Sequence, residues 1–263
     1  MRRQNITLCY AAFNQATFNQ ASFNQGTADM LNHPRSIIAI VPAAGIGSRM
    51  GADKPKQYLM LGQQSILAHT LDALLSHPDI DQVIVALHPE DNYFNQLTQS
   101  QHPKLTQVVG GAERADSVLA ALQYAESITP DAWALVHDAA RPCVSHEDIT
   151  QLINSVGIHP QGAILAAPVR DTMKRSDANG HVVHTVERAL LWHALTPQFF
   201  PVSTLRTHLS AALAAEASIT DEASAMEWAG VMPGLVIGRV DNIKVTHPDD
   251  LQLAALFMAH KRI

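Results

Sequence analysis

The chain has 263 residues, 47% of them hydrophobic and 16% charged, which allows one or two domains and a core large enough for an enzyme. Its formal net charge of −6 at pH 7 argues against recognition of nucleic acid through a basic face, because such recognition needs concentrated lysine and arginine. No apolar run is long enough to span a bilayer, and the two cysteines, Cys9 and Cys143, lie far apart without metal-ligand spacing, which favours a reduced, cytoplasmic setting.

The N-terminal stretch differs in composition from the rest of the chain. The tripeptide Phe-Asn-Gln occurs at residues 13–15, 18–20 and 23–25, a period of five that matches neither a helix nor a strand. We therefore expect residues 1–33 to be a disordered low-complexity extension. A targeting peptide and a translation start at Met30 are the alternatives.

The remainder, residues 34–263, is expected to form one α/β domain. Short β-branched runs alternate there with segments of helical periodicity, the pattern of a mainly parallel sheet flanked by helices. Helices are predicted at residues 65–75 and 115–125, where apolar residues recur on one face. Strands are predicted at residues 37–41, 82–87, 106–109, 133–137 and 163–167.

Residues 41–58, VPAAGIGSRMGADKPKQY, place a glycine turn after the first predicted strand and a group of cations behind it. Gly45 and Gly47 have no side chain, so backbone N–H groups can approach phosphates closely, while Arg49 and Lys56 supply positive charge. The Walker and dinucleotide-binding patterns are excluded, because neither the Gly-Lys-Ser/Thr ending nor the third glycine is present. The segment predicts a loop that binds a nucleoside triphosphate.

Polar residues also follow the third and fourth predicted strands, where ligands bind in doubly wound sheets. Gly111 belongs to a glycine turn that opens a helix, in which Ser117 is expected either to cap the helix or to bond a base. Asp138, just past an apolar strand, suits Mg²⁺, with a turn or N-cap aspartate as the alternative. Arg141 beside it suits a phosphate or a surface ion pair.

Residues 169–188 interrupt the alternation with two polar, extended halves. Between them lies Asp-Ala-Asn-Gly at residues 177–180, a strong hairpin-turn signal. A hairpin this polar has little apolar surface to bury, so we expect it to project as an arm that meets a partner. A disordered surface loop is the alternative.

Two further segments near the C-terminus carry candidate residues. Thr220 is the expected N-cap of a helix in ITDEASAMEW. Lys244 is predicted to lie within a short apolar strand, followed by a helix that begins near Pro248. Because its neighbours Ile243 and Val245 point to the opposite face, Lys244 faces either a cleft or the edge of the sheet.

Eight segments in this order resemble 2-C-methyl-D-erythritol 4-phosphate cytidylyltransferase of the non-mevalonate isoprenoid pathway, over roughly residues 36–261. They are VPAAGIGSRM, KPKQY, GGAERADSV, VHDAARP, APVRDTMKR, WHALTPQFF, ITDEASAME and DNIKVTHPDDL. The resemblance implies a Rossmann-like nucleotidyltransferase fold and a homodimer joined through the arm. It also implies transfer of CMP from CTP to methylerythritol phosphate, with release of pyrophosphate.

The same resemblance assigns roles to individual residues. Arg49 and Lys56 match the two groups that stabilise the transition state, and Asp138 matches the magnesium ligand. Arg188 and Lys244 match the groups that position methylerythritol phosphate for catalysis, and Thr172 and Arg188 are expected to serve the neighbouring subunit's site. The residues expected to contact CTP are Ala43, Ala44, Gly45, Gly47, Gly111 and Ser117. The residues expected to line the pocket of the acceptor are Arg141, Thr172, Thr196 and Thr220.

One departure and two alternative functions bear on this interpretation. Ala112 stands where some members of the family carry an acidic residue, so a side-chain contact to the nucleotide is not expected there. Ribitol 5-phosphate cytidylyltransferase shares the glycine loop and the C-terminal segment, but APVRDTMKR and WHALTPQ favour the methylerythritol branch. A non-catalytic nucleotide-binding module would not need Arg49, Lys56 and Asp138 together.

Overall fold

The structure is a computed structural model that describes residues 36–45 and 54–260. The expected N-terminal extension, residues 1–33, lies outside the described residues, as do the predicted site residues Gly47 and Arg49. In the described part of the chain, no helix combines the length and the apolar composition that crossing a bilayer requires.

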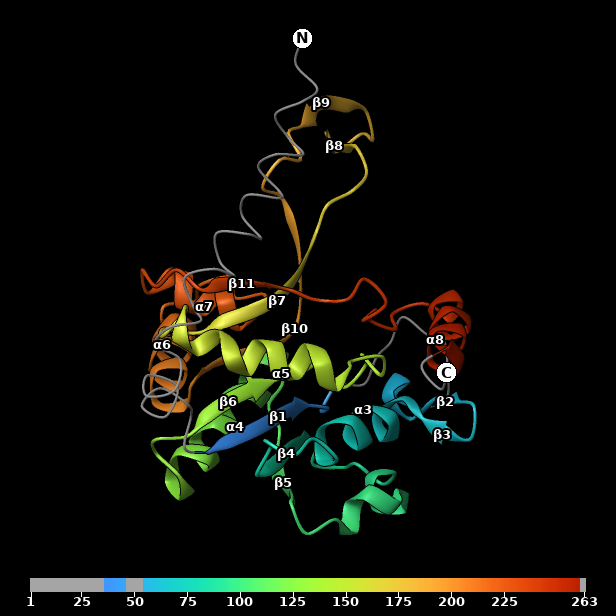
Figure 1. Cartoon of the computed structure of the whole chain (residues 1–263), viewed down its shortest axis with the longest axis vertical. Helices are drawn as coiled ribbons and strands as arrows, with labels where there is room; N and C mark the ends of the chain where they lie inside the picture. Colours follow the sequence, from blue (N-terminus) through green and yellow to red (C-terminus); the bar gives the residue numbers. More distant parts are fainter. Residues whose placement is uncertain (1–35, 46–53, 261–263) are drawn as a thin grey trace, which may run out of the picture. The chain divides into compact units, whose positions relative to one another are not determined.

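A central sheet covered by helices organises the described residues (Figure 1). The strands of this sheet are β1 (Ile37–Pro42), β4 (Gln82–Leu87), β5 (Leu105–Val109), β6 (Trp133–Val136), β7 (Ala163–Pro168), β10 (Trp192–Pro201) and β11 (Gly234–Ile237). The α-helices are α3 (Ile66–Leu75), α4 (Arg114–Ile128), α5 (His146–Asn154), α6 (Val202–Ala214), α7 (Glu222–Trp228) and α8 (Pro248–His260). The smaller elements are the pairs β2 (Met60–Leu61) with β3 (Gln64–Ser65) and β8 (Met173–Ser176) with β9 (Val182–Val186), and the 3-10 helices η2 (Lys56–Tyr58), η3 (Phe94–Gln96), η4 (Thr98–Gln101) and η5 (Ser155–Gly157).

The strand order of the main sheet is β11-β7-β10-β6-β1-β4-β5, and every neighbouring pair is parallel except the two that involve β10. The five predicted strands are confirmed as β1, β4, β5, β6 and β7. The sequence interpretation missed β10 and the edge strand β11. In β10 the pairing with β7 shifts register between Ala194 and Gln198, around Pro197, and a proline inside a strand weakens the sequence signal. The expected α/β architecture with a mainly parallel sheet is confirmed.

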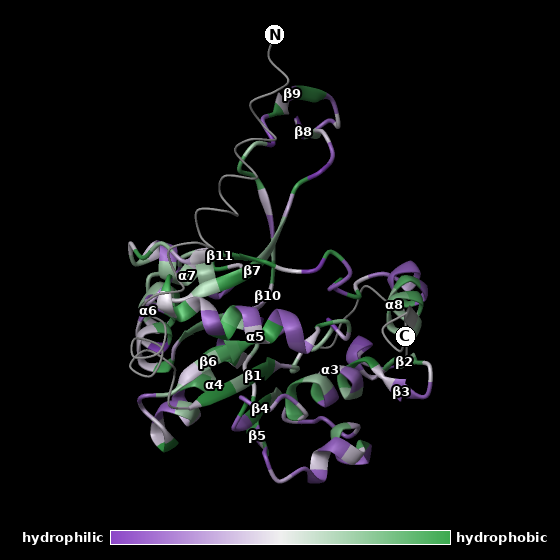
Figure 2. Cartoon of the chain, in the orientation of Figure 1, coloured by the Kyte–Doolittle hydropathy of each residue, from purple (hydrophilic) through white to green (hydrophobic). Residues whose placement is uncertain are grey.

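The central strands of the sheet are buried on both faces, which explains their continuous apolar runs. Along β1, Ile37, Ala39 and Val41 pack on the face covered by α3 and α5, while Ile38 and Ile40 pack on the face covered by α4, α6 and α7. Figure 2 shows hydrophobic colouring along the central strands and mixed colouring on the covering helices. Parallel strands covered on both sides lack polar alternation. In the sequence, the strands are therefore recognised by continuous apolar runs, whereas the covering helices are recognised by apolar residues on one face.

The starts of three helices can be compared with the predictions, of which one is confirmed and two are wrong. The α3 helix begins as predicted, and the Ser65 side chain accepts from the Ala68 N–H at 3.2 Å. The prediction that Thr220 caps α7 is wrong: Asp221 is the N-cap, and its Oδ1 accepts from the Ser224 N–H at 2.9 Å. The suggestion that Ser117 caps α4 is also wrong, because the helix already begins at Arg114.

The predicted hairpin within residues 169–188 is confirmed as β8 and β9. Its turn is closed by a bond from the Asp177 N–H to the His181 carbonyl at 2.9 Å, and Gly180 adopts a φ of +84° that favours glycine. Residues 170–185 are all exposed, and the hairpin lies beyond the ends of β7 and β10 in Figure 1. It therefore has little packing of its own against the sheet.

The segment around Lys244 is not the strand that was predicted. Residues 242–246 form neither helix nor strand, although the following helix, α8, begins at Pro248 as expected. Val245 is buried in a third cluster with residues of α8, and its N–H donates to the Ala140 carbonyl at 2.8 Å. The apolar side chains of this segment are thus buried by α8 and the loop after β6, and no strand among the described residues pairs with it.

Candidate active site

A cavity of about 310 Å³ at the carboxyl ends of β1 and β6 collects most of the predicted site residues. The ends of parallel strands and the starts of the helices that follow them lie at one edge of a sheet, where doubly wound folds bind ligands. The predicted residues that line this cavity are Ala43, Ala44, Gly45, Lys56, Gly111, Ser117, Asp138 and Lys244.

The amide of Gln57 holds the glycine turn after β1. Gln57 is buried, and its Nε2 donates to the carbonyls of Ala43 at 2.8 Å and Gly45 at 3.2 Å. These two bonds hold the carbonyls in the described part of the turn. Gln57 belongs to KPKQY, one of the segments that carry the family resemblance, but the sequence alone indicated no role for it.

The second glycine loop packs directly on the first. A Cβ added to Gly110 would lie 2.6 Å from the Cβ of Ala44, so the close approach requires glycine. The Gly111 N–H donates to Ser117 Oγ at 3.1 Å, and the Ser117 hydroxyl donates to the Glu113 carbonyl at 3.2 Å. Ser117 therefore holds the loop at the start of α4, while its contact with a base stays a prediction.

Three cations surround the buried carboxylate of Asp138. Arg114 Nε lies 2.9 Å from Oδ1, Lys244 Nζ lies 2.9 Å from Oδ2, and Arg141 Nε lies 3.5 Å from Oδ2 as an ion pair without hydrogen-bond geometry. Burial alone raises the pKa of Asp138, but the positive charges of Arg114, Lys244 and Arg141 outweigh burial and hold it well below its ordinary value. The carboxylate is therefore ionised.

Arg114 connects Asp138 to a second buried carboxylate that sequence reasoning missed. Its Nη1 and Nη2 donate to Glu222 Oε1 and Oε2 at 2.7 and 3.1 Å, in the bidentate geometry of a strong ion pair. Burial lowers the pKa of Arg114, but Glu222 and Asp138 raise it beyond its ordinary value. The signal was present, because both residues lie in the quoted segments GGAERADSV and ITDEASAME, but they are 108 positions apart.

A buried hydrogen-bond chain fixes the backbone of Asp138. Its N–H donates to Thr196 Oγ1 at 3.1 Å, and the Thr196 hydroxyl donates to His137 Nδ1 at 3.0 Å. His137 Nε2 donates to the Arg141 carbonyl at 3.0 Å, since a carbonyl can only accept, and this assigns the proton of the ring to Nε2. Thr196 is thus buried beside Asp138, with the Asn242 amide bonded to its carbonyl at 2.8 Å.

Lys56 brings a further cation to the cavity. Its Nζ lies 3.4 Å from the carbonyl oxygen of Val245, the residue that follows Lys244 in the chain. The cavity thus receives lysines from two segments 188 positions apart, together with the guanidinium of Arg114. Such a concentration of positive charge suits the phosphates of a nucleotide.

Comparison with known proteins shows which family the chain is similar to. The family model of 2-C-methyl-D-erythritol 4-phosphate cytidylyltransferase (IspD) matches residues 37–260. The chain belongs to this family. Relatives of that name are 85% identical over 232 residues in Shewanella frigidimarina, covering 88% of this chain and 100% of the relative, and 71% identical over 229 residues in Shewanella halifaxensis, covering 87% and 98%.

Solved structures of IspD proteins share the fold. The Francisella tularensis enzyme is 36% identical with a TM-score of 0.73, over 84% of this chain and 99% of that one. The Thermus thermophilus enzyme is 29% identical with a TM-score of 0.69, over 86% and 98%. The alignments span almost the whole of each solved chain.

Five residues that the IspD resemblance assigns to the acceptor substrate do not line the cavity: Arg141 and Thr196 are buried beside Asp138, and the other three are exposed. Thr172 and Arg188 are exposed at the two ends of the hairpin, where an Arg188 Nη1 bonds the Arg170 carbonyl. Thr220 is exposed in a neighbouring cavity of about 310 Å³ that shares Arg114 with the candidate site. Their roles stay predictions, and for the two hairpin residues they depend on a second subunit.

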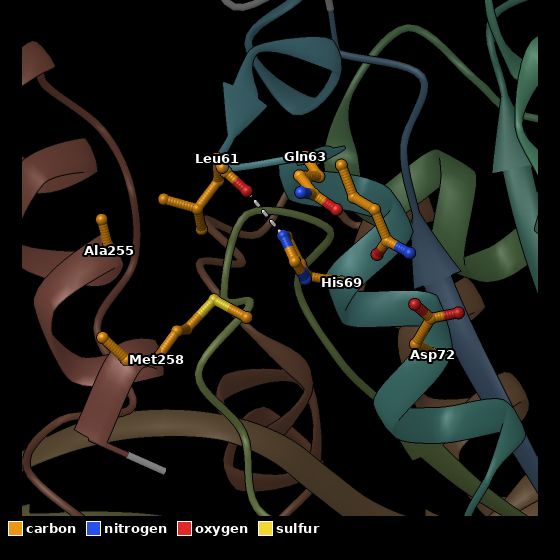
Figure 3. A pocket seen from close by; sticks show the side chains of 9 residues that line it. Leu61, Gln63, His69, Asp72, Ala255 and Met258 are labelled. Atoms are coloured by element: carbon orange, nitrogen blue, oxygen red, sulfur yellow. Dashed lines mark hydrogen bonds between the residues drawn. The ribbon is translucent and has the colours of Figure 1, made fainter. Parts of the chain in front are cut away.

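A larger cavity of about 540 Å³ lies between α3, the β2–β3 hairpin and α8 (Figure 3). His69 Nε2 donates to the Leu61 carbonyl there at 2.7 Å, and Met258 and Ala255 form the facing wall. Its described lining contains neither lysine nor arginine. A nucleotide triphosphate needs positive charge, so the smaller cavity around Asp138 is the candidate active site of this IspD chain.

Proposed function

We propose that the chain transfers CMP from CTP to 2-C-methyl-D-erythritol 4-phosphate, giving 4-diphosphocytidyl-2-C-methyl-D-erythritol and pyrophosphate. The observation that carries the proposal is the cavity at the strand ends, where Lys56, Lys244 and Arg114 surround the ionised Asp138 in a chain of the IspD family. The match covers nearly the whole length of relatives that are named for this activity.

The reaction needs charge stabilisation and positioning, with no covalent enzyme intermediate. A phosphate oxygen of the acceptor attacks the α-phosphorus of CTP, a new P–O bond forms, and the bond to the β-phosphate breaks so that pyrophosphate leaves. Lys56, and Arg49 outside the described residues, are proposed to stabilise the charge that develops at the α-phosphate. The turns at Ala43–Gly45 and Gly111 are proposed to bind the nucleotide through main-chain groups.

The donor set fits Mg²⁺ held together with a nucleotide. The described residues contain no cluster of three or more His, Cys, Asp or Glu side chains that would form an all-protein cage. Mg²⁺ commonly takes one or two carboxylates and completes its shell with phosphate oxygens and water, so the single ionised Asp138 is a suitable ligand. When bound, the ion would neutralise charge on the triphosphate.

We further propose that the chain is a homodimer joined through the hairpin and located in the cytoplasm. The hairpin carries apolar residues that are exposed in one subunit, Val182 at 62% and Val183 at 61%, and a partner would bury them. Thr172 and Arg188 would then serve the partner's site. A cytoplasmic location accords with the use of CTP, an intracellular nucleotide.

A pyrophosphate-release assay tests the proposed reaction. CTP with methylerythritol phosphate is expected to release pyrophosphate much faster than CTP with ribitol 5-phosphate, and faster than ATP, GTP or UTP with the same acceptor. Omission of Mg²⁺ is expected to abolish the signal. Equal or reversed rates with ribitol 5-phosphate would overturn the choice of acceptor, and the absence of turnover with every pair would favour a binding module.

A further inference from the structure

The three cations on Asp138 are held in different ways. Arg114 occupies Oδ1, while Lys244 and Arg141 share Oδ2. A carboxylate oxygen has two lone pairs, so a divalent cation that binds Oδ2 competes with the two cations already there, Lys244 and Arg141. The other contacts of each side chain decide which one can move.

The two arginines are fixed by partners other than Asp138. Arg114 makes two bonds to Glu222, which is buried, and Arg141 Nη1 donates to the Asn242 carbonyl at 2.7 Å. Withdrawal of either guanidinium would leave a buried acceptor without its donor, which is strongly unfavourable. Both arginines therefore stay in place.

Lys244 is held by fewer contacts. Its side chain is 38% exposed, and within the described residues the recorded partner of its ammonium is Asp138. It belongs to residues 242–246, which have no strand pairing. A lysine ammonium is a point charge on a flexible stem, so it can exchange a carboxylate oxygen for a phosphate oxygen without a fixed geometry.

We propose that Lys244 is the exchangeable cation of the site. Its ammonium neutralises Oδ2 of Asp138 until a divalent cation binds this carboxylate, and it then turns to the phosphate of the acceptor. The identity of the acceptor rests on the proposed function, whereas the exchange rests on the contacts of Asp138. Metal and acceptor should therefore bind cooperatively, because each favours the state in which Lys244 has left Asp138.

The first test measures the affinity of the full chain for Mn²⁺ by electron paramagnetic resonance, with no nucleotide present. Lys244→Met is compared with Lys56→Met, which removes the same charge from the same cavity but from a lysine bonded to the Val245 carbonyl. Lys244→Met is expected to bind Mn²⁺ about tenfold more tightly than the wild type, with a smaller change in Lys56→Met. Asp138→Asn, added to Lys244→Met, is expected to abolish the gain.

Two outcomes of this test overturn the proposal. An Mn²⁺ affinity of Lys244→Met equal to that of the wild type would show that the lysine does not compete with the metal. Equal tightening in both lysine variants would show a general effect of charge in the cavity. Both measurements are independent of turnover.

The second test measures coupling by calorimetric titration of methylerythritol phosphate and of ribitol 5-phosphate, each with and without Mn²⁺. In the wild type, Mn²⁺ is expected to tighten binding of the phosphate several-fold, and in Lys244→Met this effect is expected to vanish. A wild-type affinity that does not depend on Mn²⁺ overturns the exchange. Coupling seen with ribitol 5-phosphate alone would overturn the proposed acceptor while the exchange stands.

Discussion

Replacement of His137 by glutamine should change how the stability of the protein depends on pH. Burial lowers the pKa of His137 from its ordinary value of 6.5 to about 4, because no water solvates the charged ring. The unfolded chain therefore takes up the proton first as the pH falls. Stability from neutral His137 is fully present above pH 6.5 and is lost as the pH falls towards 4.

The magnitude follows from the size of this shift. The difference between the two pKa values corresponds to about 3 kcal/mol of unfolding free energy, at about 1.4 kcal/mol for each unit. The pKa of the neighbouring Asp138 is also lowered, but a carboxylate with a depressed pKa loses its stabilisation only below its unfolded value, at the acid end of this window. The effect of His137 can therefore be separated from that of Asp138.

Urea unfolding followed by tryptophan fluorescence, repeated between pH 4.5 and 7.5, measures the effect. His137→Gln is expected to be less stable than the wild type at pH 7.5, because it disturbs the bonds to Thr196 and Arg141, and this deficit should shrink by about 2.5 kcal/mol at pH 4.5. His181→Gln, at an exposed histidine of the hairpin, serves as the control. Parallel curves for His137→Gln and the wild type would refute the reasoning.

Two further predictions concern catalysis. Lys56→Ala is expected to lower turnover by roughly three powers of ten, the effect of losing a few kcal/mol of transition-state stabilisation, whereas Lys54→Ala, outside the cavity, should stay near the wild-type rate in the pyrophosphate assay. Turnover of Lys56→Ala at the wild-type level would contradict a catalytic role. If Arg188 serves the partner's site, refolded mixtures of Arg188→Ala and Lys56→Ala should regain about a quarter of the wild-type activity by random pairing. Mixtures no more active than the separate variants would contradict the prediction that Arg188 of one subunit serves the partner's site.

Most of the central sheet was predictable because its strands are buried on both faces. The continuous apolar runs of β1 and β4 leave little choice of structure, and the observed bounds agree with the predicted ones to within one residue. The β10 strand was missed because Pro197 and polar residues interrupt its pattern, and its place between β6 and β7 depends on pairing with strands distant in sequence. Local periodicity does not predict which distant strands pair with each other.

Errors at the segment ends have a similar cause. Thr220 and Asp221 are both good capping residues, and the sequence alone does not say which of them reaches the N–H of Ser224. The Ile243–Val245 segment alternates like a strand, but α8 covers its apolar side chains, and no strand in the described part of the chain pairs with it. Local sequence preference allows several structures for these segments, and tertiary packing determines which one forms.

By itself, the sequence determined the alternation of strands and helices, the glycine turn with its cations, and the motifs that carry the family resemblance. These features are local or follow from the order of motifs along the chain. Only the tertiary structure decided which cation meets which oxygen of Asp138, that Glu222 anchors Arg114, and that Thr196 supports the aspartate from behind. Such contacts join residues far apart in sequence, and ion pairs depend on distances and burial that exist only in the folded chain.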